Sequence, residues 1–329
     1  MRLSNVIMGL GVASLGVVIG CSSDTTPSNT PGGGNNSGGA ACAVTAAGCK
    51  TDISDCVSLV DNKDAKKFGL RIAQLTVNKP AALASGVIAT VVNNAVASNY
   101  AACTIGTSSD SIYGTGTGTF SWLIEFDMDA KTVKTGGAKP VADPTAGYCF
   151  VNDANIKPFS IAAPVGTDGK FAITDGQDLT VPIYLDAGAQ NVVLLPLHKA
   201  RLFDATLSPN QNCIGKYNAE GLDPDNTCKP DPDTKSYTFV SGGKLEGYIT
   251  IEEADAVEIE SLQKESLCVL LSGQDNGATP KRCPRGADGK ISVKGDFCSS
   301  TNSAGGCQDA YQLGADFAAN GVKISGDCK

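Results

Sequence analysis

The chain of 329 residues carries 34 acidic and 26 basic side chains, which gives a net charge of −8 with its single histidine neutral. An acidic protein is repelled by phosphate backbones, which argues against a nucleic-acid partner. A lone histidine also rules out a two-histidine metal site within one chain and disfavours catalysis by a histidine-based triad. The sequence indicates no cofactor.

The first 20 residues have the pattern of a secretory signal peptide. Arg2 precedes a 14-residue apolar segment, 6–19, which is shorter than the roughly 20 residues that a membrane-spanning helix needs. Cys21 follows in the sequence VIGC, which resembles the lipobox of bacterial lipoproteins. This resemblance implies that Cys21 receives diacylglycerol, so that the protein contacts the membrane through its lipid anchor only. The alternative is an ordinary signal peptide that ends near a cysteine.

A lipidated flexible tether is predicted over residues 21–39. Residues 22–39 consist of Ser, Thr, Asn, Pro, Gly and one Asp, a composition that cannot bury apolar area. Random-coil dimensions would hold the folded part roughly 25 Å from the membrane. In lipoproteins of this type an Asp after the lipidated cysteine retains the protein at the inner membrane. Ser22 stands there instead, so the resemblance implies an outer-membrane location, facing the periplasm or the cell surface.

Twelve further cysteines indicate a disulfide framework. Their number is even and the predicted compartment is oxidising, which favours six disulfide bonds. Metal binding is the weaker alternative, because the chain contains no C-x-x-C pair. The twelve are Cys42, Cys49, Cys56, Cys103, Cys149, Cys213, Cys228, Cys268, Cys283, Cys298, Cys307 and Cys328.

One pairing, Cys213 with Cys228, can be predicted from the residues between them. That stretch is rich in Gly, Pro, Asn and Asp, a turn-forming composition that lets the two ends meet. The rival pairs either cysteine with the C-terminal cysteine cluster, for example Cys228 with Cys268, and would tie the sheet to the tail. The first three cysteines recur every seven residues and would staple either a short helix or an irregular loop.

The first predicted strand of the folded part covers residues 68–77. Apolar and polar residues alternate on both sides of Ala73, but the alternation is interrupted there. Residues 80–99 then show helical spacing, with Pro80 in a first turn. Their Val and Ile content keeps a strand as the alternative.

Short strands separated by Gly, Asp, Asn and Pro are predicted farther along. They cover 117–129, 132–137, 171–186, 191–208, 237–242 and 244–250. A helix is expected over 250–259, because Thr250 and Glu253 have the spacing of a capping box. A last helix is expected over 307–320, ended by Gly321.

These elements predict a mainly β fold: an antiparallel β-sandwich or curved sheet with two or three helices and a disulfide-rich C-terminal part. An α+β fold is the alternative. Residues 40–250 would form the β-rich domain, and 251–329 a helical, cysteine-rich part packed on it. The stretches SWLIEFD, LPLHKARL, NCIGKYNAEGLD and LEGYITIEEADAV are similar to secreted bacterial lipoproteins, a resemblance that implies no activity.

Glu125, Asp127 and Asp129 are the sharpest candidates for catalysis. Alternate residues of a strand point to one face, and a retaining glycosidase needs two carboxyl groups about 5–5.5 Å apart. The spacing resembles the Glu-x-Asp-x-Glu motif of laminarinase-type glycoside hydrolases, with Asp in place of the last Glu. The chain has a single tryptophan, Trp122, which offers few aromatic rings for stacking on sugars in a binding cleft. A solvent-facing polar stripe is the alternative.

Three other features are weaker candidates. Aspartates in a turn-rich stretch could bind calcium, although the EF-hand pattern fails there, which favours solvated turn residues as the explanation. They are Asp223, Asp225, Asp231 and Asp233. The glycine-rich residues 113–120 lack the ending of a phosphate loop, and His198 is expected at the surface end of a strand.

The sequence therefore favours a lipid-anchored cell-envelope protein with a non-catalytic structural or ligand-binding role. Its partner would be an envelope protein or a glycan. The alternative is a carbohydrate-active hydrolase on a β-sandwich that uses Glu125, Asp127 and Asp129.

Overall fold

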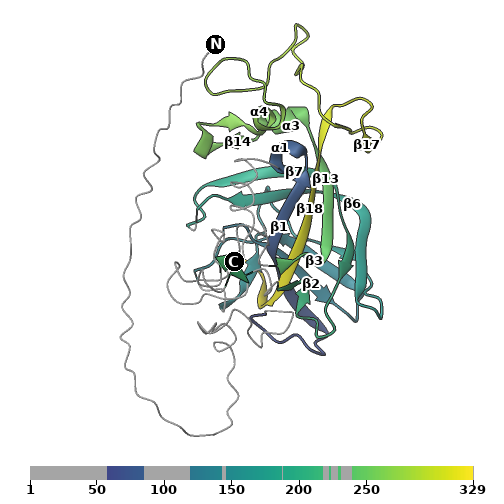
Figure 1. Ribbon diagram of the computed structural model, residues 1–329. Helices are drawn as coiled ribbons and strands as arrows, with labels where there is room; N and C mark the ends of the chain where they lie inside the picture. The colour runs from purple at the N-terminus through teal and green to yellow at the C-terminus, as the bar shows by residue number, and fades with distance from the viewer. Residues whose placement is uncertain are drawn as a thin grey trace, which may run out of the picture. The chain divides into compact units, whose positions relative to one another are not determined.

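The computed structural model describes residues 58–84, 119–142, 146–186, 188–217, 222–223, 229–230 and 239–328 (Figure 1). Eleven strands form one antiparallel sheet, and eight of them are neighbours in the order β5-β3-β2-β1-β18-β13-β7-β6. The eight are β1 (Lys67–Lys79), β2 (Trp122–Asp127), β3 (Thr132–Gly137), β5 (Phe159–Ala162), β6 (Lys170–Tyr184), β7 (Val192–Thr206), β13 (Gly243–Thr250) and β18 (Ala310–Val322). The other three, β8 (Cys213–Ile214), β16 (Phe297–Cys298) and β17 (Ser303–Ala304), join the sheet through β18.

The sheet is nearly closed on itself. Its two end strands, β5 and β6, are consecutive in the chain, and β3 approaches β6 so closely that a Cβ on Gly137 would lie 2.3 Å from Cγ of Pro182. Only glycine leaves room for this approach. Proline suits β6 at this edge, because it has no N–H group to leave unpaired. The predicted mainly β fold is confirmed, in the form of one strongly curved sheet.

A bulge in β1 explains the interrupted alternation of its sequence. The pairing of β1 with β18 shifts register between Ile72 and Gln74. Phe68, Leu70 and Ile72 face the core before the shift, and Leu75 packs against the same core after it. One extra residue reverses the side-chain phase of a strand, so the bulge keeps both apolar sets on one face.

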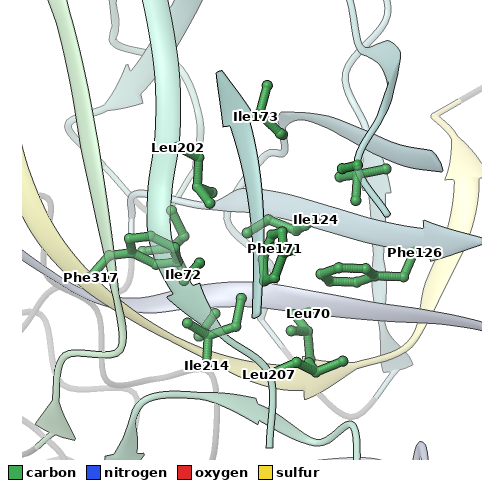
Figure 2. Packing of buried hydrophobic residues seen from close by; sticks show 14 of the residues in the cluster. Leu70, Ile72, Ile124, Phe126, Phe171, Ile173, Leu202, Leu207, Ile214 and Phe317 are labelled. Carbon is green, nitrogen blue, oxygen red and sulfur yellow. The ribbon is translucent and has the colours of Figure 1, made fainter. Parts of the chain in front are cut away.

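An apolar cluster fills the interior of the sheet (Figure 2). The buried ring of Phe126 stacks on Phe68 and meets Phe171 edge-on, with centroids 5.0 Å apart in each pair. Leu70, Ile72, Ile124, Ile173, Leu202, Leu207, Ile214 and Phe317 complete the part that Figure 2 labels. Burial of one such side chain contributes about 1.5–3 kcal/mol, so this cluster is the main source of stability in the sheet.

Residues 310–322 form strand β18, so the helix predicted over 307–320 is wrong. The alanines there favour a helix locally, but β18 pairs with β1 on one side and with β13 on the other. Phe317 and Ala319 belong to the core, and this tertiary pairing overrides local propensity. Gly321 therefore does not end a helix. It is needed for close packing instead, because a Cβ there would lie 2.2 Å from Oγ of Ser58.

Three short helices lie together at one end of the sheet (Figure 1): α1 (Ala81–Ala84), α3 (Ile251–Ala256) and α4 (Leu267–Ser272). They share an apolar cluster with Ile249 of β13 and Tyr311 of β18. The capping box predicted at Thr250 and Glu253 is confirmed, because each side chain accepts a hydrogen bond from the other residue's N–H group. Of the helix predicted over 80–99, the part after α1 lies outside the described residues.

Short strand pairs complete the described residues. These are β4 (Tyr148–Phe150) with β19 (Ile324–Asp327), β9 (Lys216–Tyr217) with β12 (Phe239–Val240), β10 (Leu222–Asp223) with β11 (Lys229–Pro230), and β14 (Glu258–Ile259) with β15 (Glu265–Ser266). A 3-10 turn, Glu260–Leu262, joins the last pair. Among the described residues no helix has the length and apolar character needed to cross a membrane. The described residues belong to one compact unit.

Candidate functional site

The three acidic residues of the glycosidase-like motif each have a local partner. Glu125 lies on β2, where its Oε2 is 3.3 Å from Nζ of Lys67. Asp127 ends the strand and accepts a hydrogen bond of 2.8 Å from the N–H group of Ala130 in the following turn. Asp129 lies in that turn, beyond the end of β2, and pairs with Lys66 at 3.4 Å. These contacts are those of a charged strand face and a capped turn.

The surroundings of Trp122 differ from those of a sugar-binding wall. Its indole packs against the core of the sheet and donates a hydrogen bond of 2.8 Å to Oγ1 of Thr135. A hollow of about 130 Å³ opens beside β2, and it is lined by Asp127, Met128 and Val165 among others, but not by Trp122, Glu125 or Asp129. The described residues therefore do not gather the three carboxylates around one cleft.

The predicted calcium residues are described only in part. Asp223 lies on β10, opposite Lys229 of β11, whereas Asp225, Asp231 and Asp233 lie outside the described residues. A calcium site in this stretch therefore stays a prediction.

His198 joins three elements through its imidazole ring. It lies on β7 opposite Tyr248 of β13, with the ring centroids 5.4 Å apart. Its Nε2 is 2.7 Å from Oε1 of Glu253 on α3, and its Nδ1 is 3.5 Å from Oδ2 of Asp178 on β6. Because both ring nitrogens face carboxylates, the imidazolium form is favoured and neither nitrogen is free to act as a general base.

A β-bulge sets the direction of this histidine. The pairings of β7 with β6 and with β13 both shift register at this point. The next residue, Lys199, has a φ of +49°, an uncommon conformation for a residue other than glycine. Its N–H group donates a hydrogen bond of 3.0 Å to Oδ1 of Asp178. The Asp178 carboxylate thus accepts the hydrogen bond of the bulged backbone and also faces the imidazole. These two contacts fix the local geometry.

The surroundings shift the pKa values of all three ionisable groups. Partial burial alone would lower the pKa of His198, but the hydrogen bond and charge of Glu253, with those of Asp178, outweigh it and raise that pKa above its ordinary 6.5. Burial would raise the pKa of Glu253, but hydrogen bonds from Thr250 and His198 lower it below 4.5. The Lys199 amide, assisted by His198, lowers the pKa of Asp178 below 3.8. These directions describe a mutually stabilised ion cluster.

A polar pocket of about 560 Å³ lies between α3 and the loop that follows α4. Its wall contains Asp255, which is only 5% exposed. The Asp255 carboxylate accepts hydrogen bonds from Oγ of Ser266 (2.9 Å), from the N–H group of Cys283 (2.8 Å) and from the guanidinium of Arg285 (3.1 Å). Three elements are thereby fixed around one buried charge, which is stable only because it is fully paired.

The arginines that line the pocket are engaged by the protein itself. Arg285 also pairs with Glu252 at 2.9 Å. Arg282 pairs with Glu258 and donates to the carbonyl of Lys264. The pocket therefore offers a polar lining in which positive and negative charges balance, and such a lining suits a neutral polar ligand better than a strongly charged one.

The sequence predictions did not include this pocket, although one signal pointed to it. Glu252 and Asp255 are three residues apart on the predicted helix 250–259 and therefore share a helical face. Their cationic partner, Arg285, is 30 or more residues farther along the chain. Nothing in the local pattern relates the two segments, so only the fold brings them together.

All seven cysteines among the described residues are in disulfides. Three bonds are Cys149–Cys328, Cys268–Cys283 and Cys298–Cys307. Cys213 is also disulfide-bonded, and its partner lies outside the described residues, so the pairing with Cys228 stays a prediction. The rival Cys228–Cys268 is wrong, because Cys268 bonds Cys283.

Two clusters of possible metal ligands among the described residues contain disulfide-bonded cysteines. One joins Asp255 to Cys268 and Cys283, and the other joins Asp309 to Cys298 and Cys307. In both, the sulfurs are bonded to each other and are not available as thiolate ligands.

No protein-family model, curated protein or solved structure matches the chain. Cys21, the predicted site of lipidation, lies outside the described residues.

Proposed function

We propose that this is a lipid-anchored protein of the bacterial cell envelope whose β domain has a non-catalytic binding or structural role. Cys21 carries the lipid, residues 22–39 are the tether, and Ser22 directs the protein to the outer membrane. The observation that carries the proposal is that every cysteine among the described residues is in a disulfide. Disulfides on this scale persist in oxidising compartments, outside the cytoplasm.

The state of the candidate catalytic groups supports a non-catalytic role. Glu125 and Asp129 pair with lysines, and Asp127 caps a turn. His198 has a carboxylate at each ring nitrogen. A general acid or base needs an ionisable group that can exchange protons with a substrate, and these groups are held by structural partners instead.

The pocket beside α3 supports the binding form of this role over the purely structural one. Its volume of about 560 Å³ falls in the usual range for small-molecule sites, which is about 300–1,000 Å³. Its charge-balanced lining fits a neutral polar ligand such as a glycan unit. The partner would then be an envelope glycan, or a protein that presents one.

Metabolic labelling with a fatty-acid analogue tests the anchor. Wild type and a Ser22→Ala control should incorporate the label, and Cys21→Ala should not. Ser22→Asp should keep the label but move the protein from the outer-membrane to the inner-membrane fraction on a density gradient. Label retained by Cys21→Ala would contradict the proposal.

A glycan array tests binding, with Asn276→Trp chosen to fill the pocket, because Asn276 lines it and is exposed. Specific binding by wild type that is lost in this variant would support the pocket as the site. Glycan turnover that is lost in Glu125→Gln would instead establish the hydrolase alternative.

A further inference from the structure

The cluster around His198 connects the long β6–β7 hairpin to the helix that carries the pocket. Asp178 belongs to β6, His198 to β7 and Glu253 to α3. Glu253 is also half of the capping box, since its Oε2 accepts hydrogen bonds from the N–H group (3.1 Å) and the hydroxyl (2.6 Å) of Thr250. The same carboxylate therefore holds both the first turn of α3 and the imidazole.

Two pocket residues lie on this helix, next to the group that His198 contacts. Glu252 and Asp255 flank Glu253 within one turn of α3, and both line the pocket. A change in how Glu253 is held changes the support of the helix that positions them. α3 has only six residues, too few to be stable without tertiary contacts.

From this geometry we infer that His198 is a pH-responsive clasp: its protonated ring ties α3 to the β6–β7 hairpin and so holds the wall of the polar pocket in place. Loss of the proton removes the charge that attracts two carboxylates and leaves one of the two ring nitrogens without an N–H to donate. The contact that reaches α3 is the one with Glu253, at 2.7 Å, and it weakens because it changes from a charge-assisted to an ordinary hydrogen bond. The inference does not depend on lipidation of Cys21.

The charged groups around the ring set the direction of the response. Asp178 faces it from β6 and Glu253 from α3, and both are negative. Tyr248 covers the ring from β13, and Lys199 follows it on β7, where it interacts with Asp178. Asp309 lies near Tyr248 and adds negative charge on that side. The negative groups outnumber the single lysine, so the cluster favours the imidazolium.

The sign of the response follows from the direction of each pKa shift. The pKa of His198 is raised, so its contribution is complete below about 6.5 and is lost as the pH rises through the higher folded-state value. The pKa values of Glu253 and Asp178 are lowered, so their contributions are lost only in more acidic solution, below 4.5 and 3.8. The clasp is therefore closed at mildly acidic pH and loosens toward alkaline pH.

Histidine-selective NMR of the full chain in detergent tests the first step directly, because this histidine is the only one in the protein. Its pKa should lie above 6.5 in wild type and fall in Asp178→Asn, which leaves the capping box of α3 intact. A wild-type pKa at or below 6.5 would overturn the inference.

Hydrogen exchange measured by mass spectrometry tests the second step. After correction for intrinsic rates, the amides of 251–257 should exchange about two- to five-fold faster at pH 8.5 than at pH 5.5, as expected for partly exposed ion pairs. His198→Gln should exchange at the faster rate at both pH values. The control Lys264→Gln removes an exposed ion pair with Glu260 elsewhere in the same region and should keep the wild-type response. A response that persists in His198→Gln would also overturn the inference.

Discussion

The curved sheet and the segment 251–309, which we name the C-terminal cap, are stabilised in different ways. The sheet contains strands of 13 to 15 residues, whose alternating side chains enclose a large apolar core. The elements of the cap have two to six residues, and two of them, β16 and β17, join the sheet through β18. The cap adds two disulfides, Cys268–Cys283 and Cys298–Cys307, and the ion pairs around Arg282 and Arg285. Short elements bury too little apolar area by themselves, and cross-links compensate.

The largest effect is expected from a cavity in the sheet. Phe126→Ala should lower the free energy of unfolding by about 3–5 kcal/mol, because Phe126 is fully buried between Phe68 and Phe171. Urea titration followed by circular dichroism measures the change. The matched control is Leu262→Ala in the cap, which is 42% exposed and should cost less than about 0.5 kcal/mol. Similar losses at the two positions would refute the view that the sheet core dominates stability.

Removal of a disulfide from the cap should have a smaller and more local effect. A closed loop of 15 residues between Cys268 and Cys283 is worth about 3 kcal/mol on the chain-entropy model. The double variant Cys268→Ser/Cys283→Ser should therefore expose α4 to proteolysis and hydrogen exchange, while β1 and β18 stay protected. The comparison variant Cys298→Ser/Cys307→Ser should leave α4 protected. Global unfolding of the first variant would show that sheet and cap are one cooperative unit.

The same five-residue turn motif occurs in both regions, so one substitution can be compared in the two environments. The residues G-x-D-G-K occur at 166–170 beside the sheet and at 286–290 in the cap. Both turns have the same backbone hydrogen bonds, from the N–H of the first glycine to the lysine carbonyl and from the N–H of the second glycine to the carbonyl of the first. The second glycines, Gly169 and Gly289, have φ values of +79° and +77°.

Alanine substitutions at Gly169 and Gly289 should separate the cost of a left-handed backbone from the cost of a steric overlap. Gly289→Ala has open space around its new Cβ and should cost only the left-handed conformation, about 1–2 kcal/mol. Gly169→Ala would place its Cβ 2.4 Å from the carbonyl oxygen of Leu207, which adds about 1–3 kcal/mol of overpacking. Thermal unfolding of the two variants measures the difference. Equal costs would mean that the backbone beside the sheet can relax.

The sheet could be predicted from the sequence wherever local pattern and tertiary environment agree. β1 shows an alternation that places one apolar set on the core, and the interruption of this alternation coincides with its bulge. β2 and β3 could be predicted because turn-forming residues bound them. β18 was mispredicted because a strand paired on both sides can be built from small residues such as Ala315 and Ala319, whose local preference is helical. The environment that makes them a strand is supplied by β1 and β13, which are distant in sequence.

The contacts of the candidate sites also differ in whether they are local in sequence, and only the local ones could be predicted. The capping box at Thr250 and Glu253 depends on a spacing of three residues and could be predicted. The contact of Glu253 with His198 spans 55 residues, and that of Asp255 with Arg285 spans 30. Such contacts are set by strand register and loop path, which charge and spacing alone do not reveal.

The smallest predicted effect concerns the ion cluster that joins the sheet to the cap. Half-exposed ion pairs contribute about 0.2–1 kcal/mol, so His198→Gln should lower the free energy of unfolding by this amount near pH 5.5. The raised pKa of His198 means that the folded state binds the proton more tightly than the unfolded state. The stability difference between wild type and His198→Gln should therefore shrink as the pH rises through that pKa, and it should also shrink below pH 4.5 as Glu253 becomes protonated. Parallel urea titrations at pH 4, 5.5 and 8.5 measure this difference and cancel the titration of carboxylates that both proteins share. A difference that grows toward alkaline pH would mean that the neutral ring is the form that the cluster binds.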